Sequence, residues 1–377
     1  MASHIGQTLQ LSIFGESHGQ AIGCVLEGLP AGFSIDLDAL QEFMDRRAPG
    51  HSRISTSRKE ADQPFFLSGT TYDEAHHCEV TTGSPICVLI QNQNARSQDY
   101  QALTCTPRPG HADLTAYLKY HGYADMSGGG HFSGRLTAPL CVAGGIALQF
   151  LEQRDITIVG HIKRIHSVED ERLDWLDLSQ TQLCCIADNP LPTISLQASL
   201  NMQSTIKQAQ HQGDSVGGII ECVAYGVPAG LGTPIFGGIE NRVAQAMFGI
   251  PAAKGIEFGA GFDAATLYGS QNNDSFTTDD SCNFISSRSN NAGGILGGIT
   301  TGMPLVTSIA IKPTPSIATE QQTVEIDNSK NTERFTNTTI SVHGRHDPCI
   351  VPRAVPVCEA VLAFTLLDIM LSEASLN

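Results

Sequence analysis

The residues best suited to chemistry gather between positions 106 and 138. The chain there reads Thr-Pro-Arg-Pro-Gly-His-Ala-Asp and, after a short gap, Ser-Gly-Gly-Gly-His-Phe-Ser-Gly-Arg-Leu-Thr-Ala. Prolines restrict the backbone, and glycines let it turn sharply and approach a ligand closely. The charged or titratable side chains of this stretch are Arg108, His111, Asp113, His131 and Arg135. Their combination predicts a loop that binds an anion and moves a proton.

Other groups that could transfer protons also lie beside glycine or proline. His18 stands in Gly-Glu-Ser-His-Gly, and His346 and Asp347 stand in Gly-Arg-His-Asp-Pro. An imidazole titrates near neutral pH and can protonate a leaving phosphate or a cofactor nitrogen, an effect typically worth about 10²–10⁴ in rate. A single histidine is more often an ordinary hydrogen-bonding side chain. The catalytic hypothesis therefore depends on several of these groups converging.

Arginines and hydroxyl residues mark places where a phosphate or carboxylate could bind. Arg47 and Arg53 flank a Pro-Gly bend, and Ser133 and Arg135 begin a predicted helix, where free backbone N–H groups favour anions. A second candidate cradle, stiffened by two prolines, contains Lys312, Thr314 and Ser316. The sequence has no P-loop signature, no Rossmann glycine spacing and no metal-ligand spacing of Cys and His.

Composition limits the classes of partner and the location. The net charge of −16 argues against nonspecific binding to nucleic acid or an anionic membrane, because both need a basic surface. Arginine nevertheless outnumbers lysine, 15 to 7, which is consistent with a local basic pocket. The 11 cysteines form no C-x-x-C pair and no apolar leader precedes Gln10, so a cytoplasmic location is expected. The apolar runs at 136–151 and 356–371 are expected to be core helices.

The elements that must position these residues follow a pattern that recurs along the chain. The first half contains expected strands and helices over 8–14, 21–26, 37–47, 86–90 and 136–151. The second half contains an expected strand over 219–225 and helix over 240–248. Two turn motifs recur with them: Gly-Leu-Pro-Ala-Gly at 28–32 returns as Gly-Val-Pro-Ala-Gly at 226–230, and Thr-Thr-Gly-Ser-Pro at 81–85 returns as Thr-Thr-Gly-Met-Pro at 300–304.

The recurring motifs predict one domain over 1–377, built from two copies, roughly 8–151 and 215–371, around a pseudo-twofold axis. Arg353 is the expected counterpart of Arg135. A polar, acidic stretch over 160–212 is expected to be a peripheral insertion, and 317–338 to be a flexible lid or a plain surface loop. Independent use of Gly/Pro turn chemistry remains the alternative to a true repeat.

Taken together and in order, the motifs resemble those of chorismate synthase over nearly the whole chain. The segments concerned are 15–19, 46–53, 108–113, 128–137, 288–298 and 344–349. The resemblance implies an α/β (α+β) fold in which helices lie between antiparallel sheets, not a Rossmann fold, and a homotetramer of the monofunctional, bacterial type. No extra domain is evident, so an external flavin reductase or reductant is expected, and NADP is associated with the family.

The activity implied by the resemblance is the anti 1,4-elimination of phosphate from 5-enolpyruvylshikimate 3-phosphate, which gives chorismate. It requires reduced FMN although the overall reaction is redox-neutral. The resemblance places His18 near the substrate phosphate as a general acid, His111 near flavin N1 and Asp347 near flavin N5. Its substrate-binding residues are Ser17, Arg47, Arg53, Arg108, Ser133, Arg135 and Arg345. Its flavin-binding residues are Arg53, Phe132, Ser133, Gly134, Pro251, Ala252, Gly297, Lys312, Thr314, Ser316 and Arg345.

The chain departs from the family pattern in one of its motifs. Where the family usually reads Gly-Gly-Gly-Arg-Ser-Ser-Ala-Arg-Glu-Thr-Ala, this chain has His131, Phe132, Gly134 and Leu136. Pro251 likewise stands where some members have Asn. Because the serine and arginine of the motif are kept, activity is still expected. The residues alone also leave open a flavin-independent phosphohydrolase and a noncatalytic binder of phosphorylated metabolites; dependence on flavin distinguishes the three functions.

Overall fold

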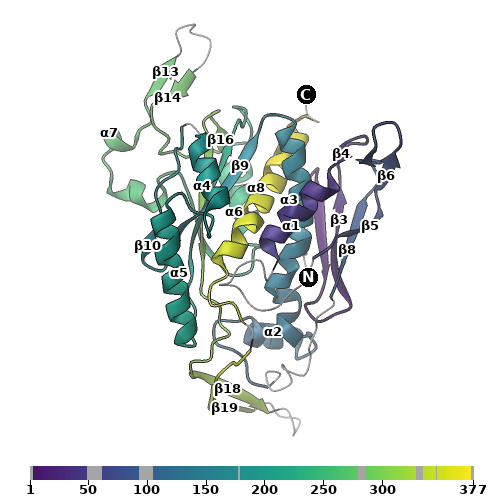
Figure 1. Cartoon of the computed structure of the whole chain (residues 1–377), viewed down its shortest axis with the longest axis vertical. Coiled ribbons are helices and arrows are strands. Elements are labelled where there is room, and N and C mark those ends of the chain that lie inside the picture. Colours follow the sequence, from purple (N-terminus) through teal and green to yellow (C-terminus); the bar gives the residue numbers. More distant parts are fainter. Residues whose placement is uncertain are drawn as a thin grey trace.

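The computed structural model describes residues 3–48, 62–92, 105–176, 179–278, 285–327, 334–344 and 346–374. Within these ranges, two five-stranded antiparallel sheets enclose a layer of helices (Figure 1). The first sheet has the order β1 (His4–Ile5), β2 (Gln10–Gly15), β3 (Ala21–Glu27), β8 (Ile86–Gln91) and β5 (Phe65–Ser68). The second has the order β10 (Val168–Glu169), β9 (Thr157–Ile165), β11 (Gly218–Tyr225), β17 (Leu305–Ile311) and β12 (Ala253–Phe258). The expected antiparallel sandwich is confirmed.

The helices between the sheets form the centre of the core. They are α1 (Leu37–Arg47), α3 (Thr137–Glu152), α6 (Ile239–Met247) and α8 (Val351–Ala374). A Cβ atom at Gly144 would lie 2.3 Å from Cβ of Ala360, so this glycine lets α3 and α8 cross closely. By length and composition, α8 and the helical stretch Gly134–Glu152, which adds a 3-10 turn to α3, could cross a membrane, but 89% and 78% of their most apolar windows are buried. They are core helices, as the sequence predicts.

Local sequence explains the elements that carry the predicted motifs. In β8 the buried side chains Ile86, Val88 and Ile90 alternate with more exposed ones, which is the period of a strand with one face on the core. The side chain of Asp36 accepts hydrogen bonds from the backbone N–H groups of Asp38 and Ala39 and caps α1. That helix ends at Arg47, as expected.

The two large sheets have corresponding strand orders and turns. The strand order β2-β3-β8-β5 in one sheet corresponds to β9-β11-β17-β12 in the other. The first sheet packs on α3 and the second on α8. In the first half, Thr81 Oγ1 donates to the carbonyl of Pro30 at 2.6 Å. In the second, Thr300 Oγ1 donates to the carbonyl of Pro228 at 2.7 Å. The recurring sequence motifs thus occupy matching turns.

Two expected segments differ from the structure. The peripheral insertion cannot begin at residue 160, because Ile162 and Ile165 are fully buried in β9, a strand of the second sheet. The outer part consists of α4 (Gln180–Asp188) and α5 (Leu196–His211), which flank that sheet in Figure 1. The segment expected as a lid or loop forms a hairpin of β18 (Gln321–Asp327) and β19 (Arg334–Ile340).

The smaller elements are β4 (Ser34–Ile35), β6 (Thr70–Asp73), β7 (Cys78–Thr81), α2 (Asp113–Tyr120), α7 (Gly269–Asn272), β13 (Phe276–Thr278), β14 (Ile285–Ser287), β15 (Ile295–Leu296) and β16 (Ile299–Thr300).

The C-terminal helix is attached to the start of the chain. The carboxylate of Asp368, on α8, accepts hydrogen bonds from the backbone N–H groups of Gln7, Thr8 and Leu9 at 2.9–3.1 Å. The same carboxylate forms an ion pair with Arg242 of α6. Asp368 is nearly completely buried, so these bonds replace the water that an ionised carboxylate would otherwise need. They fix the chain just before β2.

Candidate active site

Two predicted catalytic histidines lie against one glycine turn. The turn is the short 3-10 helix Ser127–Phe132, in which Gly128 and Gly129 have φ angles of 62° and 92°. A Cβ atom at Gly128 would lie 2.6 Å from Nε2 of His18, and one at Gly129 would lie 3.2 Å from Nε2 of His111. The glycines therefore supply both the left-handed backbone and the space that the imidazoles occupy. His18 and His111 thus lie against the same glycine run.

The loop between β2 and β3 brings the first of these histidines to the turn. The neighbouring Ser17 is buried, and its backbone N–H donates to the carbonyl of Gly130 at 3.1 Å. The side-chain amide of Asn92 donates to the carbonyls of Glu16 and Gly19, at 3.1 and 2.9 Å. These bonds attach the loop to the glycine turn on one side and to the end of β8 on the other.

The second histidine is held by a buried carboxylate. Nδ1 of His111 lies 2.5 Å from Oδ1 of Asp113, which also accepts from Arg108 Nη2 at 2.8 Å; Oδ2 accepts from Arg108 Nε at 2.7 Å. Burial raises the pKa of Asp113, but the hydrogen bonds from Arg108 and His111 outweigh it and hold the pKa well below its usual range. An ionised carboxylate can only accept, so Nδ1 carries the hydrogen and Nε2 faces the glycine turn.

The turn after β17 packs against the same loop. Arg108 Nη1 donates to Ser316 Oγ at 3.1 Å, and Lys312 Nζ donates to the carbonyl of Gly110 at 2.9 Å. Thr314 Oγ1 donates to the backbone carbonyl of Asp347 at 2.8 Å. Burial, and then Lys254, lower the pKa of Lys312. A lysine with two hydroxyls on a proline-stiffened turn is a donor set that suits a phosphate group.

Two predicted substrate-binding arginines share one buried carboxylate. Asp62 accepts hydrogen bonds from Nη1 of Arg47 and Nη1 of Arg135. Arg47 Nε also donates to Thr137 Oγ1 at 3.1 Å, and Arg135 Nε donates to Asn92 Oδ1 at 3.0 Å. Burial raises the pKa of Asp62, but the two arginines outweigh it and keep the pKa below its usual range. The guanidinium groups are therefore oriented before any ligand binds.

A third arginine connects this pair to the predicted catalytic aspartate. Arg353 forms an ion pair with the carboxylate of Asp347, and its Nε donates to the backbone carbonyl of Arg47 at 2.9 Å. Arg353 was expected only as a counterpart of Arg135, without a role of its own. Burial and then the charge of Arg108 lower the pKa of the neighbouring His346, although Asp347 opposes them.

Sequence reasoning also missed Asp62 and Asn92. Neither stands in a motif that signals chemistry by itself, and their partners lie far away in sequence. Asp113 was noted only as a charged member of its loop. Its position two residues after His111, with an arginine three residues before the histidine, is the signal that could have revealed its role.

Four more predicted flavin-binding residues, Phe132, Ser133, Gly134 and Ala252, lie within or beside the glycine turn or beside Lys312. Ser133 accepts from the backbone N–H of Arg135 at 3.3 Å, and the ring of Phe132 lies 6.5 Å from that of Tyr120. A Cβ atom at Gly134 would have no neighbour within 4 Å. The carbonyl of Ala252, which follows Pro251, accepts from the backbone N–H of Lys312 at 3.0 Å.

One predicted residue of the described ranges, Gly297, is not brought to the set. Gly297 lies in the turn between β15 and β16, beyond the start of β17, whereas Lys312 follows the end of that strand. The structure of one chain therefore separates the two residues by the length of β17. Arg53 and Arg345 lie outside the described residues.

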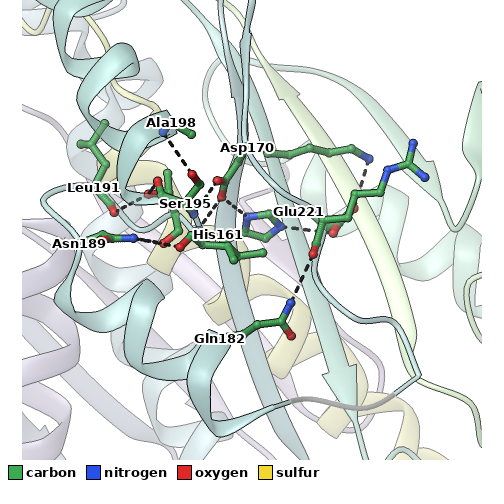
Figure 2. Close-up of polar contacts among 12 residues, drawn as sticks. His161, Asp170, Gln182, Asn189, Leu191, Ser195, Ala198 and Glu221 are labelled. Carbon is green, nitrogen blue, oxygen red and sulfur yellow. Dashed lines mark hydrogen bonds and ion pairs between the residues drawn. The ribbon is translucent and has the colours of Figure 1, made fainter.

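A second buried polar cluster lies on the second sheet, apart from this site. In Figure 2 the ring of His161 lies between the carboxylates of Asp170 and Glu221, with both N···O distances 3.3 Å. Glu221 also accepts from Lys163 Nζ at 3.2 Å and from Trp175 Nε1 at 3.1 Å. The carboxylate of Asp170 accepts hydrogen bonds from the backbone N–H groups of Ile194 and Ser195, which precede α5. This cluster fixes the outer helices to the sheet.

Buried arginines and imidazoles around a glycine turn define an enzyme site for a small anionic substrate. A family model described as chorismate synthase matches residues 9–371. Curated chorismate synthases are 43% identical over 382 residues in Lancefieldella parvula (99% of this chain, 97% of the relative) and 42% over 378 residues in Methanosarcina barkeri (100% and 98%). A solved structure titled "Crystal Structure of Chorismate Synthase" aligns with a TM-score of 0.75 at 28% identity, covering 98% of this chain and 93% of the other.

The chain therefore belongs to the chorismate synthase family. Members of the family are carbon–oxygen lyases that act on phosphates (EC 4.2.3.5) in the shikimate pathway of aromatic amino acid biosynthesis. The relatives include archaeal as well as bacterial proteins, so the comparisons do not separate a bacterial type.

Proposed function

We propose that the chain converts 5-enolpyruvylshikimate 3-phosphate to chorismate and phosphate by anti 1,4-elimination. The observation that carries this proposal is the placement of His18 and His111 against one glycine turn. Three buried arginines of the first half, Arg47, Arg108 and Arg135, lie close to that turn, and Arg108 donates to Ser316 of the second half. A substrate with a phosphate and two carboxylates needs such a concentration of guanidinium groups.

The substrate would be bound and oriented by Arg47 and Arg135, whose guanidinium groups Asp62 holds. His18 would act as the general acid that protonates the departing phosphate, with Ser17 beside it. Preorganised donors of this kind cost no reorientation at the moment of reaction, which is the reason for burying their supporting carboxylate. Arg108 would complete the set of anion-binding groups, and Ser133, Arg53 and Arg345 are proposed contacts.

The residues present suit the phosphate of a flavin mononucleotide. Lys312, Thr314 and Ser316 would hold that phosphate. When bound, reduced FMN supplies the transient electron that helps to expel the substrate phosphate and is restored within the cycle. His111, whose Nδ1–H is directed to Asp113, would take up and return a proton at Nε2, and Asp347, held by Arg353, would assist removal of the substrate hydrogen. Further proposed contacts are Phe132, Gly134, Pro251 and Ala252.

We propose a homotetramer in which a neighbouring copy completes the flavin site. β17 has seven residues, and at about 3.3 Å per residue it separates Gly297 from Lys312 by roughly 20 Å within one chain. If Gly297 contacts the same flavin as Lys312, a second copy must supply it. The protein is proposed to be a cytoplasmic, monofunctional enzyme that receives reduced flavin from an external reductase or reductant.

The chain is further proposed to be one domain that arose from two copies of a unit, joined about a pseudo-twofold axis. The corresponding strand orders of the two sheets support this proposal, as do the matching bonds of Thr81 and Thr300. With β9 included, the second copy would begin near residue 157. Superposing the two halves tests the repeat: a shared path for paired strands is expected, and unrelated paths would exclude it.

An anaerobic assay tests the proposed function. The purified protein is mixed with 5-enolpyruvylshikimate 3-phosphate, with and without reduced FMN, and chorismate and phosphate are measured together. Equal amounts of both products, formed only with reduced FMN, are expected. Phosphate released without flavin would instead identify a phosphohydrolase, and tight binding without turnover would identify a noncatalytic binder.

A further inference from the structure

His131, at the position where the family pattern has arginine, joins three segments that are distant in sequence. Its Nδ1 lies 2.8 Å from the backbone carbonyl of Gly15, at the end of β2. Its Nε2 lies 2.8 Å from Oγ of Ser3, just before β1. The histidine itself belongs to the glycine turn that contacts His18. One side chain thus attaches the glycine turn to the residue before β1 and to the last residue of β2, which pairs with β1.

The partners of His131 determine which ring nitrogen carries the hydrogen. A backbone carbonyl can only accept, so Nδ1 must donate to Gly15. Nε2 then presents a lone pair, which accepts the hydroxyl hydrogen of Ser3. The contact with the strand end is therefore a donated N–H bond in a fixed direction.

We infer that His131 is a positioning residue for His18. Gly15 begins the loop that carries His18, and this bond joins the turn to that loop together with the Ser17–Gly130 backbone bond. Without the Gly15 bond, the turn loses a directed attachment to the start of the loop and can shift relative to the imidazole. Because Gly128 leaves no spare space beside His18 Nε2, a small shift of the turn moves the ring. This inference rests on the proposed role of His18.

Two amide substitutions separate the two bonds of the imidazole. In His131→Asn the amide nitrogen occupies the place of Nδ1, so the bond to Gly15 is kept. In His131→Gln the amide reaches toward Ser3 and the Gly15 bond is lost. We expect kcat of the Asn variant within about threefold of the parent and kcat of the Gln variant lower by about 10–100-fold, with KM for the substrate changed less than twofold. Ser3→Ala, which removes the other bond only, is the matched control and should resemble the parent.

Two experiments test the inference. In the first, kcat is measured for His131→Gln in a His18→Ala background. In the second, crystal structures of His131→Asn and His131→Gln are determined. We expect no further loss of kcat once His18 is absent, and a displaced His18 ring in the Gln variant but not in the Asn variant. An equal loss in both backgrounds, equal kcat for Asn and Gln, or an unmoved His18 ring in the Gln variant would overturn the inference. If His18→Ala keeps full turnover, the proposed role of His18 fails instead, and the ring positions still decide whether residue 131 places it.

Discussion

Nδ1 of His111 and Oδ1 of Asp113 lie 2.5 Å apart, and the same carboxylate receives three hydrogen bonds from a buried arginine, two from its guanidinium and one from its backbone N–H. The pair determines which nitrogen of the imidazole faces the glycine turn. It also prevents Arg108 from being a buried charge without a counterion. The acid–base group and the anion-binding group of this loop are thus oriented by one carboxylate.

Replacing Asp113 with asparagine should therefore reduce turnover strongly. An amide can either donate or accept, so it no longer requires Nδ1 of His111 to carry the hydrogen, and we expect kcat to fall by about 10²-fold or more. Anaerobic single-turnover kinetics with reduced FMN measure the effect. Asp38→Asn, at an exposed position in the first turn of α1, is the control. A kcat close to that of the parent would show that Asp113 does not orient His111.

Asp62→Asn should destabilise the fold and weaken substrate binding together. It removes the negative charge between Arg47 and Arg135, and breaking a buried ion pair costs about 3–5 kcal/mol. Urea unfolding should show the loss in the free energy of unfolding, and KM should rise because the guanidinium groups lose their orientation. If KM instead falls while the stability is unchanged, the carboxylate competes with the substrate rather than positioning its ligands.

Replacement by alanine should lower kcat at one glycine of this segment and leave kcat nearly unchanged at another. Gly128→Ala forces an L-residue into a left-handed backbone and drives a methyl group into His18, so kcat should fall by about 10²-fold or more. Gly134→Ala should leave kcat within about twofold, because the added Cβ has no neighbour within 4 Å and because alanine is the family's residue at this proposed flavin contact. Equal activities of the two variants would be inconsistent with the packing of His18 on the turn.

The cluster around His161 should make stability depend on pH. Burial lowers the pKa of His161, but hydrogen bonds to Asp170 and Glu221 outweigh it and raise the pKa above 6.5. This stabilisation is complete below pH 6.5 and is lost as the pH rises through the higher folded value. Burial raises the pKa of Glu221, yet its partners, His161 first, lower it to about 2, so its stabilisation is present above about pH 4.5 and is lost toward pH 2.

The cluster therefore contributes most between about pH 4.5 and 6.5. Chemical unfolding between pH 6 and 9 should show that His161→Gln removes a decline of up to about 1.4 kcal/mol per pH unit that the parent shows above pH 6.5. His166→Gln, at an exposed histidine near the end of β9, should keep the parental slope. Identical slopes for the parent and His161→Gln would mean that His161 does not change its charge on unfolding.

Periodicity and turn chemistry were sufficient to predict much of the fold. The alternation in β8, the cap at Asp36 and the apolar runs of α3 and α8 are local signals, and each predicted element formed. The boundary of the outer insertion was misjudged at β9. A strand that is buried on both faces and ends in a histidine-rich, charged stretch does not alternate clearly, so its apolar residues were assigned to a polar segment.

The site was predictable where its residues stood in local motifs. His18, His111, Arg108 and the glycine turn lie together in the structure, and each could be singled out beforehand because it lies beside Gly or Pro in a recognisable pattern. The carboxylates that orient them could not be found as readily. Asp62 reaches Arg135 across 73 positions, and such a pairing depends on how the sheet and helices pack rather than on neighbouring sequence.

Asp368 has a consequence for the order in which the protein matures during synthesis. Its carboxylate binds the backbone of Thr8, 360 positions earlier, at the entrance to the hairpin that carries His18. Arg353, on the same helix, binds the carbonyl of Arg47. A nascent chain therefore lacks the final anchors of its first hairpin and first helix until α8 has left the ribosome. The first hairpin and the first helix therefore depend on α8, a distant part of the same chain, for their final positions.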